Sequence, residues 1–497
     1  MNLPDHRQAY ELLRRGDVDG ALKLTGALMG LPQPAAGAYA ARAAVLKAAG
    51  RPQEALTVNR EAAARYPSSG ATWHNLAATL GDLGHGREAT EAARRAIGLG
   101  LAAPETRLVL ARALQSEHEY DEAEAAFGEA LRLRPDYEEA HTELAQLIWM
   151  RTGDAERALG ALRRAVAANP GHSGLAYALA MAEQFTDQRA AARATAEQGL
   201  ARTPQDRRLL SLAVELCCRL GDAPAAVRWA SLAQGDDPVA NVLRAQALLA
   251  SGEAAAAAVA AEAAVRQQPD YQYSIALMAT AWRVAGDPRY GDAYDYDRLV
   301  ATEDIVDPET RDGAAFLEEL RAALRRLHRF STHPFGQSVR QGSQATLRLD
   351  GTHEPAIERL LELLRGAVAR RVAAIGQGPG LFERRNTGAA SFSGAWSIRL
   401  TGGQGHHADH IHPMGWISSA FYVSTPDEVA DEGAKRGWIK FGEPGVATAT
   451  PLAAERFVRP RPGRLVLFPS YMWHGTVPYE GSAERMTVAF DAVPRVG

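Results

Sequence analysis

Residues 137–170 read YEEAHTELAQLIWMRTGDAERALGALRRAVAANP, and the first half of the chain is built on this pattern. Two alanine- and leucine-rich segments are separated by Gly153 and Asp154, and Pro170 closes the stretch. Glycine permits the left-handed backbone that ends a helix, and proline cannot continue one. The stretch therefore predicts two helices joined by a short turn, with the small side chain of Ala158 allowing the helices to approach closely.

The same pattern recurs along residues 1–290 at spacings of 31 to 35 residues. The turn positions are Gly16, Gly50, Gly84, His118, Gly153, Asp187, Gly221 and Gly252, with a partial ninth turn at Gly286. Five residues after the first eight stand Ala21, Ala55, Ala89, Ala123, Ala158, Ala192, Ala226 and Ala257. One helical hairpin cannot bury its apolar face alone, so eight hairpins are expected to stack into a superhelix. The period, the alanines and the closing prolines resemble the tetratricopeptide repeat, whose groove implies a peptide or protein partner.

Composition narrows the classes of function. The 497 residues carry 55 basic and 59 acidic side chains, a net charge of −4, without the basic excess typical of nucleic-acid binding. The two cysteines, Cys217 and Cys218, are adjacent, which excludes a disulfide framework. The first residues are charged where a signal peptide needs an apolar run, and no apolar stretch is long enough to span a bilayer. We therefore expect a cytoplasmic protein that binds neither nucleic acid nor membrane.

After residue 290 the repeat stops and the pattern changes. Residues 291–329 are expected to form a helical linker with one amphipathic helix, and residues 356–375 have the spacing of a second helix. Short apolar segments separated by glycine and proline follow, including WISSAFYV at 416–423 and GRLVLFP at 463–469. Residues 330–497 therefore predict an α+β domain with a β-sandwich or barrel.

Histidines gather in this second region. The stretch HHADHIHP spans residues 406–413, and one further histidine, His474, follows an apolar strand. Residues i and i+2 of an extended segment share a face, so either His410 with His412 or His407 with Asp409 can offer two ligand atoms to one metal. His474 would be the third ligand. Imidazole and carboxylate ligands without thiolate permit Fe(II).

Two further residues are candidates for binding an anion. Arg485 opens the apolar strand RMTVAFDAV, and an arginine in such surroundings needs an anion, most naturally a carboxylate held by both arms of its guanidinium. Tyr422 is a candidate second donor to that carboxylate, or else an aromatic core residue.

The segments QSVRQGSQ, WSIRL, HHADHIHP, GWISSAFYV, GRLVLFPSYMWHGT and ERMTVAFD resemble, in this order over residues 325–497, the 2-oxoglutarate/Fe(II) oxygenases with a double-stranded β-helix. The resemblance implies Fe(II) as cofactor, 2-oxoglutarate and O2 as co-substrates, His474 as the distal metal ligand and Arg485 on the distal carboxylate of 2-oxoglutarate. The His-x-Asp pattern of the wider class matches His407 and Asp409. The His-x-His-Pro pattern of this branch matches His410 and His412, which we favour.

The expected fold is an all-α tetratricopeptide-repeat superhelix followed by an α+β double-stranded β-helix (jelly-roll) domain. The expected function is a 2-oxoglutarate/Fe(II)-dependent dioxygenase of the hydroxylase type, acting on a peptide or protein that the repeats present. Two alternatives remain open at this point. One is a non-catalytic scaffold that binds metal or 2-oxoglutarate, and the other is an oxygenase acting on a small molecule.

Overall fold

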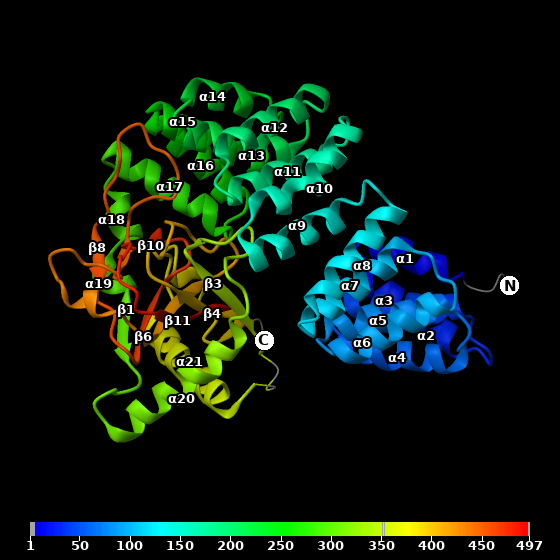
Figure 1. The fold of residues 1–497 in the computed structure, drawn as a ribbon. Helices are drawn as coiled ribbons and strands as arrows, with labels where there is room; N and C mark the ends of the chain where they lie inside the picture. Colours follow the sequence, from blue (N-terminus) through cyan, green and yellow to red (C-terminus); the bar gives the residue numbers. More distant parts are fainter. Residues whose placement is uncertain (1–4, 350, 352, 496–497) are drawn as a thin grey trace. The chain divides into compact units, whose positions relative to one another are not determined.

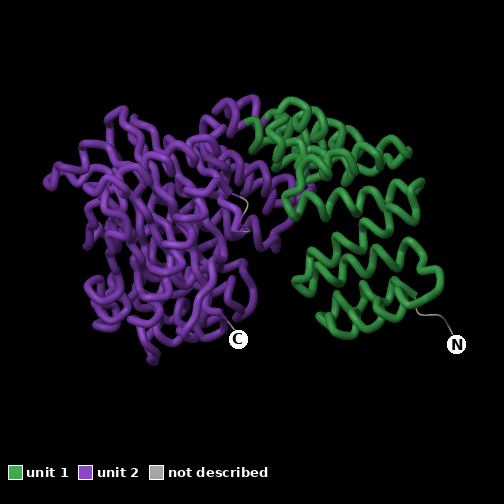
Figure 2. The backbone as a smooth tube through the Cα atoms, turned by 90° about the horizontal axis from the view of Figure 1, so that it is seen from below, with its two compact units in different colours: residues 1–148, 160–169 green, residues 149–159, 170–497 purple. Residues whose placement is uncertain are grey.

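The computed structural model describes residues 5–349, 351 and 353–495 (Figure 1). Contacts between Cα atoms divide the chain into two compact units (Figure 2). The first contains residues 1–148 and 160–169, and the second contains residues 149–159 and 170–497.

The first unit consists of paired helices. Its helices are α1 (His6–Arg14), α2 (Val18–Met29), α3 (Ala36–Ala48), α4 (Pro52–Arg65), α5 (Gly70–Asp82), α6 (Gly86–Gly98), α7 (Pro104–Ser116) and α8 (Tyr120–Leu133). Two more helices, α9 (Glu138–Thr152) and α10 (Ala155–Ala168), lie partly in each unit. The second unit continues the pattern with α11 (Ser173–Phe185), α12 (Arg189–Arg202), α13 (Arg207–Arg219), α14 (Ala223–Ser231), α15 (Pro238–Ser251), α16 (Ala254–Gln267) and α17 (Gln272–Ala285).

The turn residues and alanines of the repeats have the backbone conformation and burial that the sequence pattern predicts. All nine predicted turn residues have positive φ, from 61° at Asp187 to 88° at Gly252. Seven of them are glycine, which adopts this backbone without steric cost, whereas His118 and Asp187 are not. The eight alanines that follow the turns are between 0% and 1% exposed, so they lie at the contacts between helices. The predicted superhelix of tetratricopeptide-type hairpins is confirmed.

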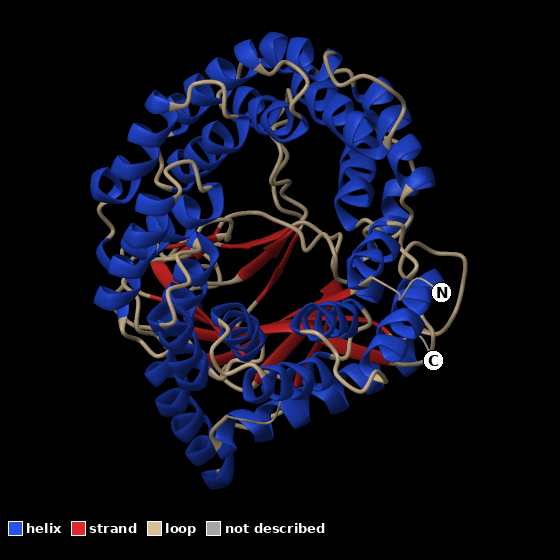
Figure 3. Cartoon of the chain, turned by 90° about the vertical axis from the view of Figure 1, so that its right-hand side faces the viewer, coloured by secondary structure: helices blue, strands red, loops and turns tan. Residues whose placement is uncertain are grey.

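The remainder of the second unit is rich in strands. Its helices are α18 (Arg289–Ala293), α19 (Tyr296–Leu299), α20 (Arg311–Leu327) and α21 (Pro355–Ile375). Its strands are β1 (Ala301–Asp304), β2 (Val339–Arg340), β3 (Gly342–Leu347), β4 (Ala390–Leu400), β5 (His406–His407), β6 (Ile417–Ser424), β7 (Ile439–Phe441), β8 (Arg456–Val458), β9 (Arg464–Pro469), β10 (His474–Thr476) and β11 (Arg485–Pro494). Figure 3 shows the helices in blue and the strands in red.

The strands form three antiparallel sheets. The large sheet has the order β1-β9-β6-β11-β4-β3, a second sheet has the order β10-β7-β8, and β2 pairs with β5. The ring of Phe468 on the large sheet contacts the rings of Phe441 and His474 on the second sheet, with centroids 5.0 and 4.5 Å apart. Helices α20 and α21 pack against β6 and β4 of the large sheet. The two facing sheets with flanking helices agree with the predicted α+β double-stranded β-helix.

The unit boundary does not coincide with residue 290, where the repeats were expected to give way to a linker. One hydrophobic cluster joins residues of α15–α17, such as Trp282, to residues of the large sheet, such as Phe468. Trp473 Nε1 donates to Thr280 Oγ1 at 2.9 Å, which ties the two parts together. The segment expected to be a linker also supplies β1, which pairs with β9 at the edge of the large sheet.

Within the described ranges, no helix is both long enough and apolar enough to cross a membrane.

Candidate metal centre

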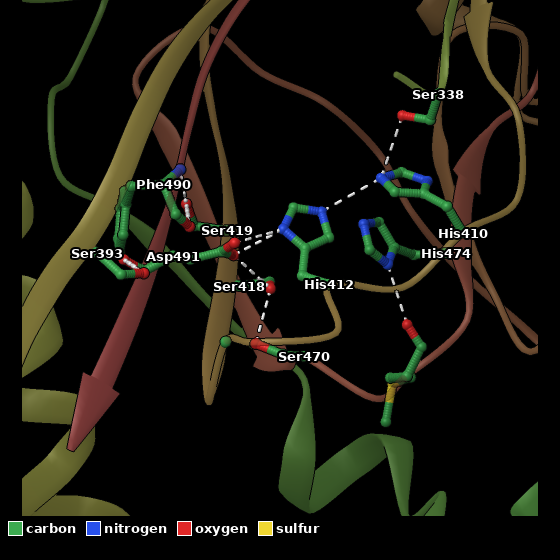
Figure 4. A network of polar contacts seen from close by, with 12 residues as sticks. Ser338, Ser393, His410, His412, Ser418, Ser419, Ser470, His474, Phe490 and Asp491 are labelled. Atoms are coloured by element: carbon green, nitrogen blue, oxygen red, sulfur yellow. Dashed lines mark hydrogen bonds and ion pairs between the residues drawn. The ribbon is translucent and has the colours of Figure 1, made fainter. Parts of the chain in front are cut away.

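Three histidines from two separate stretches meet beside the large sheet. His410 and His412 lie on the segment between β5 and β6, and His474 opens β10. Backbone hydrogen bonds between His410 and His474 join the two stretches as an antiparallel bridge. One ring nitrogen from each of the three lies within 4.8 Å of the others, and Figure 4 shows the rings gathered together.

The second ring nitrogen of each histidine is already occupied. Nδ1 of His410 lies 2.8 Å from the carbonyl oxygen of Ala408, and Nδ1 of His474 lies 2.9 Å from that of Met472. Nδ1 of His412 lies 2.7 Å from the carboxylate of Asp491. Since Nδ1 donates its hydrogen in each case, the lone pair of a neutral ring is on Nε2. The three Nε2 atoms are therefore the available ligand atoms.

The electrostatics keep these rings ready to bind a cation. Burial lowers the pKa of His410 to about 3 and that of His474 well below its ordinary value. Burial also acts to lower the pKa of His412, but the charge and hydrogen bond of Asp491 outweigh it and raise that pKa. At neutral pH the rings of His410 and His474 are neutral, which is the form that binds a metal.

Asp491 is supported from its other side. Its carboxylate accepts a hydrogen bond from Ser418 Oγ at 2.7 Å, and Ser418 Oγ lies 2.8 Å from Ser470 Oγ (Figure 4). A carboxylate that holds the far nitrogen of a ligating histidine fixes the ring and raises its basicity. The donor set of three imidazoles, one of them backed by a carboxylate, fits a divalent transition metal such as Fe(II).

The alternative pair lies nearby but is engaged elsewhere. Nδ1 of His407 lies 3.0 Å from Ser338 Oγ. Oδ2 of Asp409 accepts a charged hydrogen bond from Lys440 Nζ at 2.9 Å, whereas its Oδ1 is buried and has no hydrogen-bond partner among the described residues. Burial raises the pKa of Asp409, and Lys440 opposes this rise. The geometry favours the trio of His410, His412 and His474, and this choice of ligands stays a prediction.

Arg485 lines the same cavity as the three histidines, and Tyr422 lies beside it. Arg485 is 2% exposed, and its Nε donates to the carbonyl oxygen of Gly437 at 3.2 Å. Its guanidinium carbon lies 5.1 Å from the centre of the Tyr422 ring. Among the described residues, no carboxylate forms an ion pair with Arg485, and the hydroxyl of Tyr422 is buried beside its guanidinium. Burial raises the pKa of Tyr422, although the charge and hydrogen bond of Arg485 act to lower it. The guanidinium of Arg485 is thus buried without a counter-ion in the described part of the chain.

Comparison with protein families agrees with this arrangement. Residues 394–491 match the family described as "Putative 2OG-Fe(II) oxygenase". We call this segment the oxygenase-like region. A tetratricopeptide-repeat family matches residues 104–147. No curated protein matches the chain.

Three solved structures similar to this chain are repeat proteins. A tetratricopeptide repeat protein from Parabacteroides merdae is 16% identical and covers 55% of this chain and 96% of its own, with a TM-score of 0.35. MamA from Desulfovibrio magneticus is 17% identical and covers 34% of this chain and 94% of its own, with a TM-score of 0.30. YrrB, a repeat protein with an unusual peptide-binding site, is 17% identical over 35% of this chain and 90% of its own, with a TM-score of 0.27. Likeness at this level carries no conclusion about partners.

A cavity of about 960 Å³ connects the oxygenase-like region to the repeats of the second unit. The three histidines and Arg485 line its oxygenase-like side. Residues at the ends of α9 and α11 and on α13 line its repeat side, among them Trp149, Phe185 and Arg219. The repeats therefore form one wall of the candidate site.

Sequence reasoning missed Asp491, although a signal for it was present. Arg485, Thr487 and Ala489 alternate onto one face of the last strand, and one more step of two reaches Asp491. A carboxylate on the same face as Arg485, in a strand that is otherwise apolar, indicates a polar site. No comparable pattern indicated Ser338, whose Oγ lies 3.2 Å from Nε2 of His410.

Proposed function

We propose that this chain is an Fe(II)- and 2-oxoglutarate-dependent oxygenase that hydroxylates a peptide or protein presented by its repeats. The observation that carries the proposal is that three Nε2 atoms and an unpaired guanidinium face one cavity. The histidines would hold Fe(II), and Arg485 with Tyr422 would hold the distal carboxylate of 2-oxoglutarate. When bound, the metal would couple the conversion of 2-oxoglutarate and O2 to succinate and CO2 with hydroxylation of a C–H bond of the substrate.

The chain's own residues have three tasks in this reaction. The Nδ1 hydrogen bonds orient the three imidazoles, so the ligand set is assembled before the metal arrives. The guanidinium of Arg485 can hold a carboxylate with two parallel hydrogen bonds, which fixes the orientation of the co-substrate. The sheets and the repeats enclose the cavity and limit access of water to the reacting atoms.

The proposed class of substrate is inferred from the residues that line the cavity. The ends of α9 and α11 and helix α13 belong to the repeats, and they line the same cavity as the histidines. Stacked repeats create extended concave surfaces that suit polypeptides. A substrate bound in this cavity would contact these residues, which supports a peptide or protein. The size of the cavity, about 960 Å³, also suits a small molecule, and this is the second candidate.

The test measures succinate formed from 2-oxoglutarate in air by the full chain with added Fe(II), with His474→Ala as the inactive control. A cell extract is then separated into fractions above and below about 1 kDa, which divides peptides and proteins from small metabolites. We expect the heavier fraction to stimulate turnover and protease treatment to remove the stimulation. Stimulation by the lighter fraction alone would select the small-molecule candidate. Absence of succinate under every condition would leave a non-catalytic binding protein.

A further inference from the structure

The cavity lining includes charged side chains that the proposed chemistry does not use. Asp187 follows α11, Arg189 begins α12, and Glu215 and Arg219 lie on α13, so these four come from the repeats. Arg340 comes from β2 of the strand-rich part. The cavity therefore presents charges from both parts of the second unit to whatever occupies it.

The carboxylates that line the cavity are already engaged. Asp187 lies 3.5 Å from Arg189, and Glu215 accepts hydrogen bonds from Arg219 Nε and Gln184 Nε2, both at 2.9 Å. On the oxygenase-like side, Oδ2 of Asp409 pairs with Lys440 and Asp491 pairs with His412, while Oδ1 of Asp409 is buried without a hydrogen-bond partner among the described residues. Each acidic side chain thus has at least one cationic or hydrogen-bonding partner within the protein.

Arg340, by contrast, forms no ion pair with any of these carboxylates. Its Nη1 donates to the carbonyl oxygens of Gln337 and Val339, both at 2.8 Å, and among the described residues no carboxylate forms an ion pair with it. Burial lowers the pKa of Arg340, and the nearby charges of Arg189 and Arg219 act in the same direction, against Asp187. A half-buried guanidinium without a counter-ion is unfavourable, and an incoming anion would relieve this.

The position of Arg340 relates it to the metal centre. Val339 pairs with His407 and Arg340 pairs with His406 where β2 meets β5. Ser338, two residues before Arg340, has its Oγ 3.2 Å from Nε2 of His410. Two residues of extended chain span about 7 Å, so Arg340 lies close along the chain to a residue that contacts a candidate metal ligand. That is a suitable place for a substrate contact, since Arg485 would serve the co-substrate.

We propose that Arg340 binds an oxyanion, either a carboxylate or a phosphate, on the substrate of this site, at the border between the repeats and the oxygenase-like region. This inference rests on the proposed function and narrows its substrate to an acidic or phosphorylated peptide. The cavity then holds two separate anion positions, with Arg485 for 2-oxoglutarate and Arg340 for the substrate. Arg189 and Arg219 add positive potential along the repeat wall.

The test uses the full chain loaded with Zn(II) and 2-oxoglutarate, and three capped pentapeptides, Ac-Gly-Gly-X-Gly-Gly-NH2, with X as glutamate, phosphoserine or glutamine. Binding is followed by NMR titration of the peptide resonances. We expect the glutamate peptide, the phosphoserine peptide or both to bind at least about tenfold more tightly than the glutamine peptide. Glutamate and phosphoserine distinguish the two sources of the oxyanion.

Arg340→Gln should abolish that preference while retention of Zn(II) and 2-oxoglutarate stays unchanged. Arg340→Lys keeps the charge and should keep a weaker preference, which guards against misfolding of the glutamine variant. Arg326→Gln removes an exposed arginine that pairs with Glu354 outside the cavity and should change nothing.

Three results would overturn the inference. Equal binding of all three peptides by the unmodified protein is the first, and a preference that survives Arg340→Gln is the second. Loss of 2-oxoglutarate in Arg340→Gln is the third, because it would make Arg340 the co-substrate residue. If the unmodified protein retained neither metal nor 2-oxoglutarate, the proposed function itself would fail, and this inference with it.

Discussion

Nδ1 of His412 lies 2.7 Å from Oδ1 and 2.8 Å from Oδ2 of Asp491, which places a carboxylate one imidazole away from the candidate metal position. A site of two histidines and one carboxylate neutralises part of the charge of Fe(II) directly. Here all three candidate ligands are imidazoles, which carry no negative charge, so Asp491 supplies the nearest compensating charge through the ring of His412. The carboxylate is therefore expected to matter for metal affinity although it would not touch the metal.

Replacing Asp491 by asparagine tests this relationship. Asp491→Asn keeps the size of the side chain and removes its charge, so we expect the affinity for Fe(II) or Co(II) to fall by about 10- to 100-fold. Anaerobic competition titration against a chelator measures the change. Asp304→Asn is the matched control, because Asp304 pairs with Arg464 at the edge strand β1. Equal affinities of Asp491→Asn and the unmodified protein would contradict the expected role.

The choice between the two candidate ligand pairs can be made by metal content. His410→Ala, His412→Ala and His474→Ala should each lose Fe(II) during gel filtration, because each removes one of the three converging Nε2 atoms. His407→Ala and Asp409→Asn should retain it, since these side chains are engaged by Ser338 and Lys440. Loss of metal in either of the latter variants, with the fold intact by circular dichroism, would move the ligand set to the alternative pair.

Arg485→Gln should separate co-substrate binding from metal binding. The loss of a charge-assisted double hydrogen bond corresponds to about a 10- to 100-fold increase in the 2-oxoglutarate concentration needed for half-saturation. Tyr422→Phe removes one neutral hydroxyl and should raise that concentration only a few fold, by about the value of one hydrogen bond. The affinity for Fe(II) should be unchanged in both variants. An unaltered requirement in Arg485→Gln would mean that another cation holds the co-substrate.

The sequence predicted the repeats because a fixed period places glycine and alanine where the geometry of a helix pair needs them. It also predicted the strands around His474 and Arg485, because their apolar segments are short and separated by turn residues. It did not predict β1, because Ala301–Asp304 is polar and exposed on most positions and depends on β9 for its hydrogen bonds. Nor could it indicate that Lys440 engages Asp409, because that contact depends on how β7 lies beside the histidine-rich segment.

Half-buried His328 should make stability depend on pH. Its Nδ1 lies 2.8 Å from Ser343 Oγ and its Nε2 lies 2.9 Å from Ser397 Oγ, and burial lowers its pKa to about 4. The unfolded chain binds the proton near pH ~6.5, so the unfolded state gains protons first as the pH falls. Stability is therefore complete above pH ~6.5 and is lost between pH ~6.5 and 4, by on the order of 3 kcal/mol.

Thermal melting between pH 7 and 4 would measure this loss in the unmodified protein and in His328→Gln. We expect the variant to be less stable at pH 7, because glutamine does not reproduce both contacts, and to show a shallower decline. His333, whose pKa burial also lowers to about 4, supplies part of the remaining slope. Identical slopes in the two proteins would show that His328 does not contribute.

Replacing glycine by alanine at two positions of the first unit, one in a turn and one inside a helix, should change stability in opposite directions. Gly84 has φ 76°, so Gly84→Ala places a Cβ in the left-handed region and should destabilise its hairpin by about 1 kcal/mol. Gly128 lies inside helix α8, where an added Cβ would meet nothing within 4 Å. Gly128→Ala should stabilise that helix by about 0.5 to 1 kcal/mol.

His118 provides the reverse change at a turn. It has φ 68° without being glycine, so His118→Gly should stabilise its hairpin by about 0.5 to 1 kcal/mol, less the value of its contact with Tyr120. Hydrogen–deuterium exchange of peptides from each hairpin measures these local free energies, since repeats open locally rather than all at once. If Gly84→Ala and Gly128→Ala shifted exchange in the same direction, backbone conformation would not be what sets the turn residues of this array.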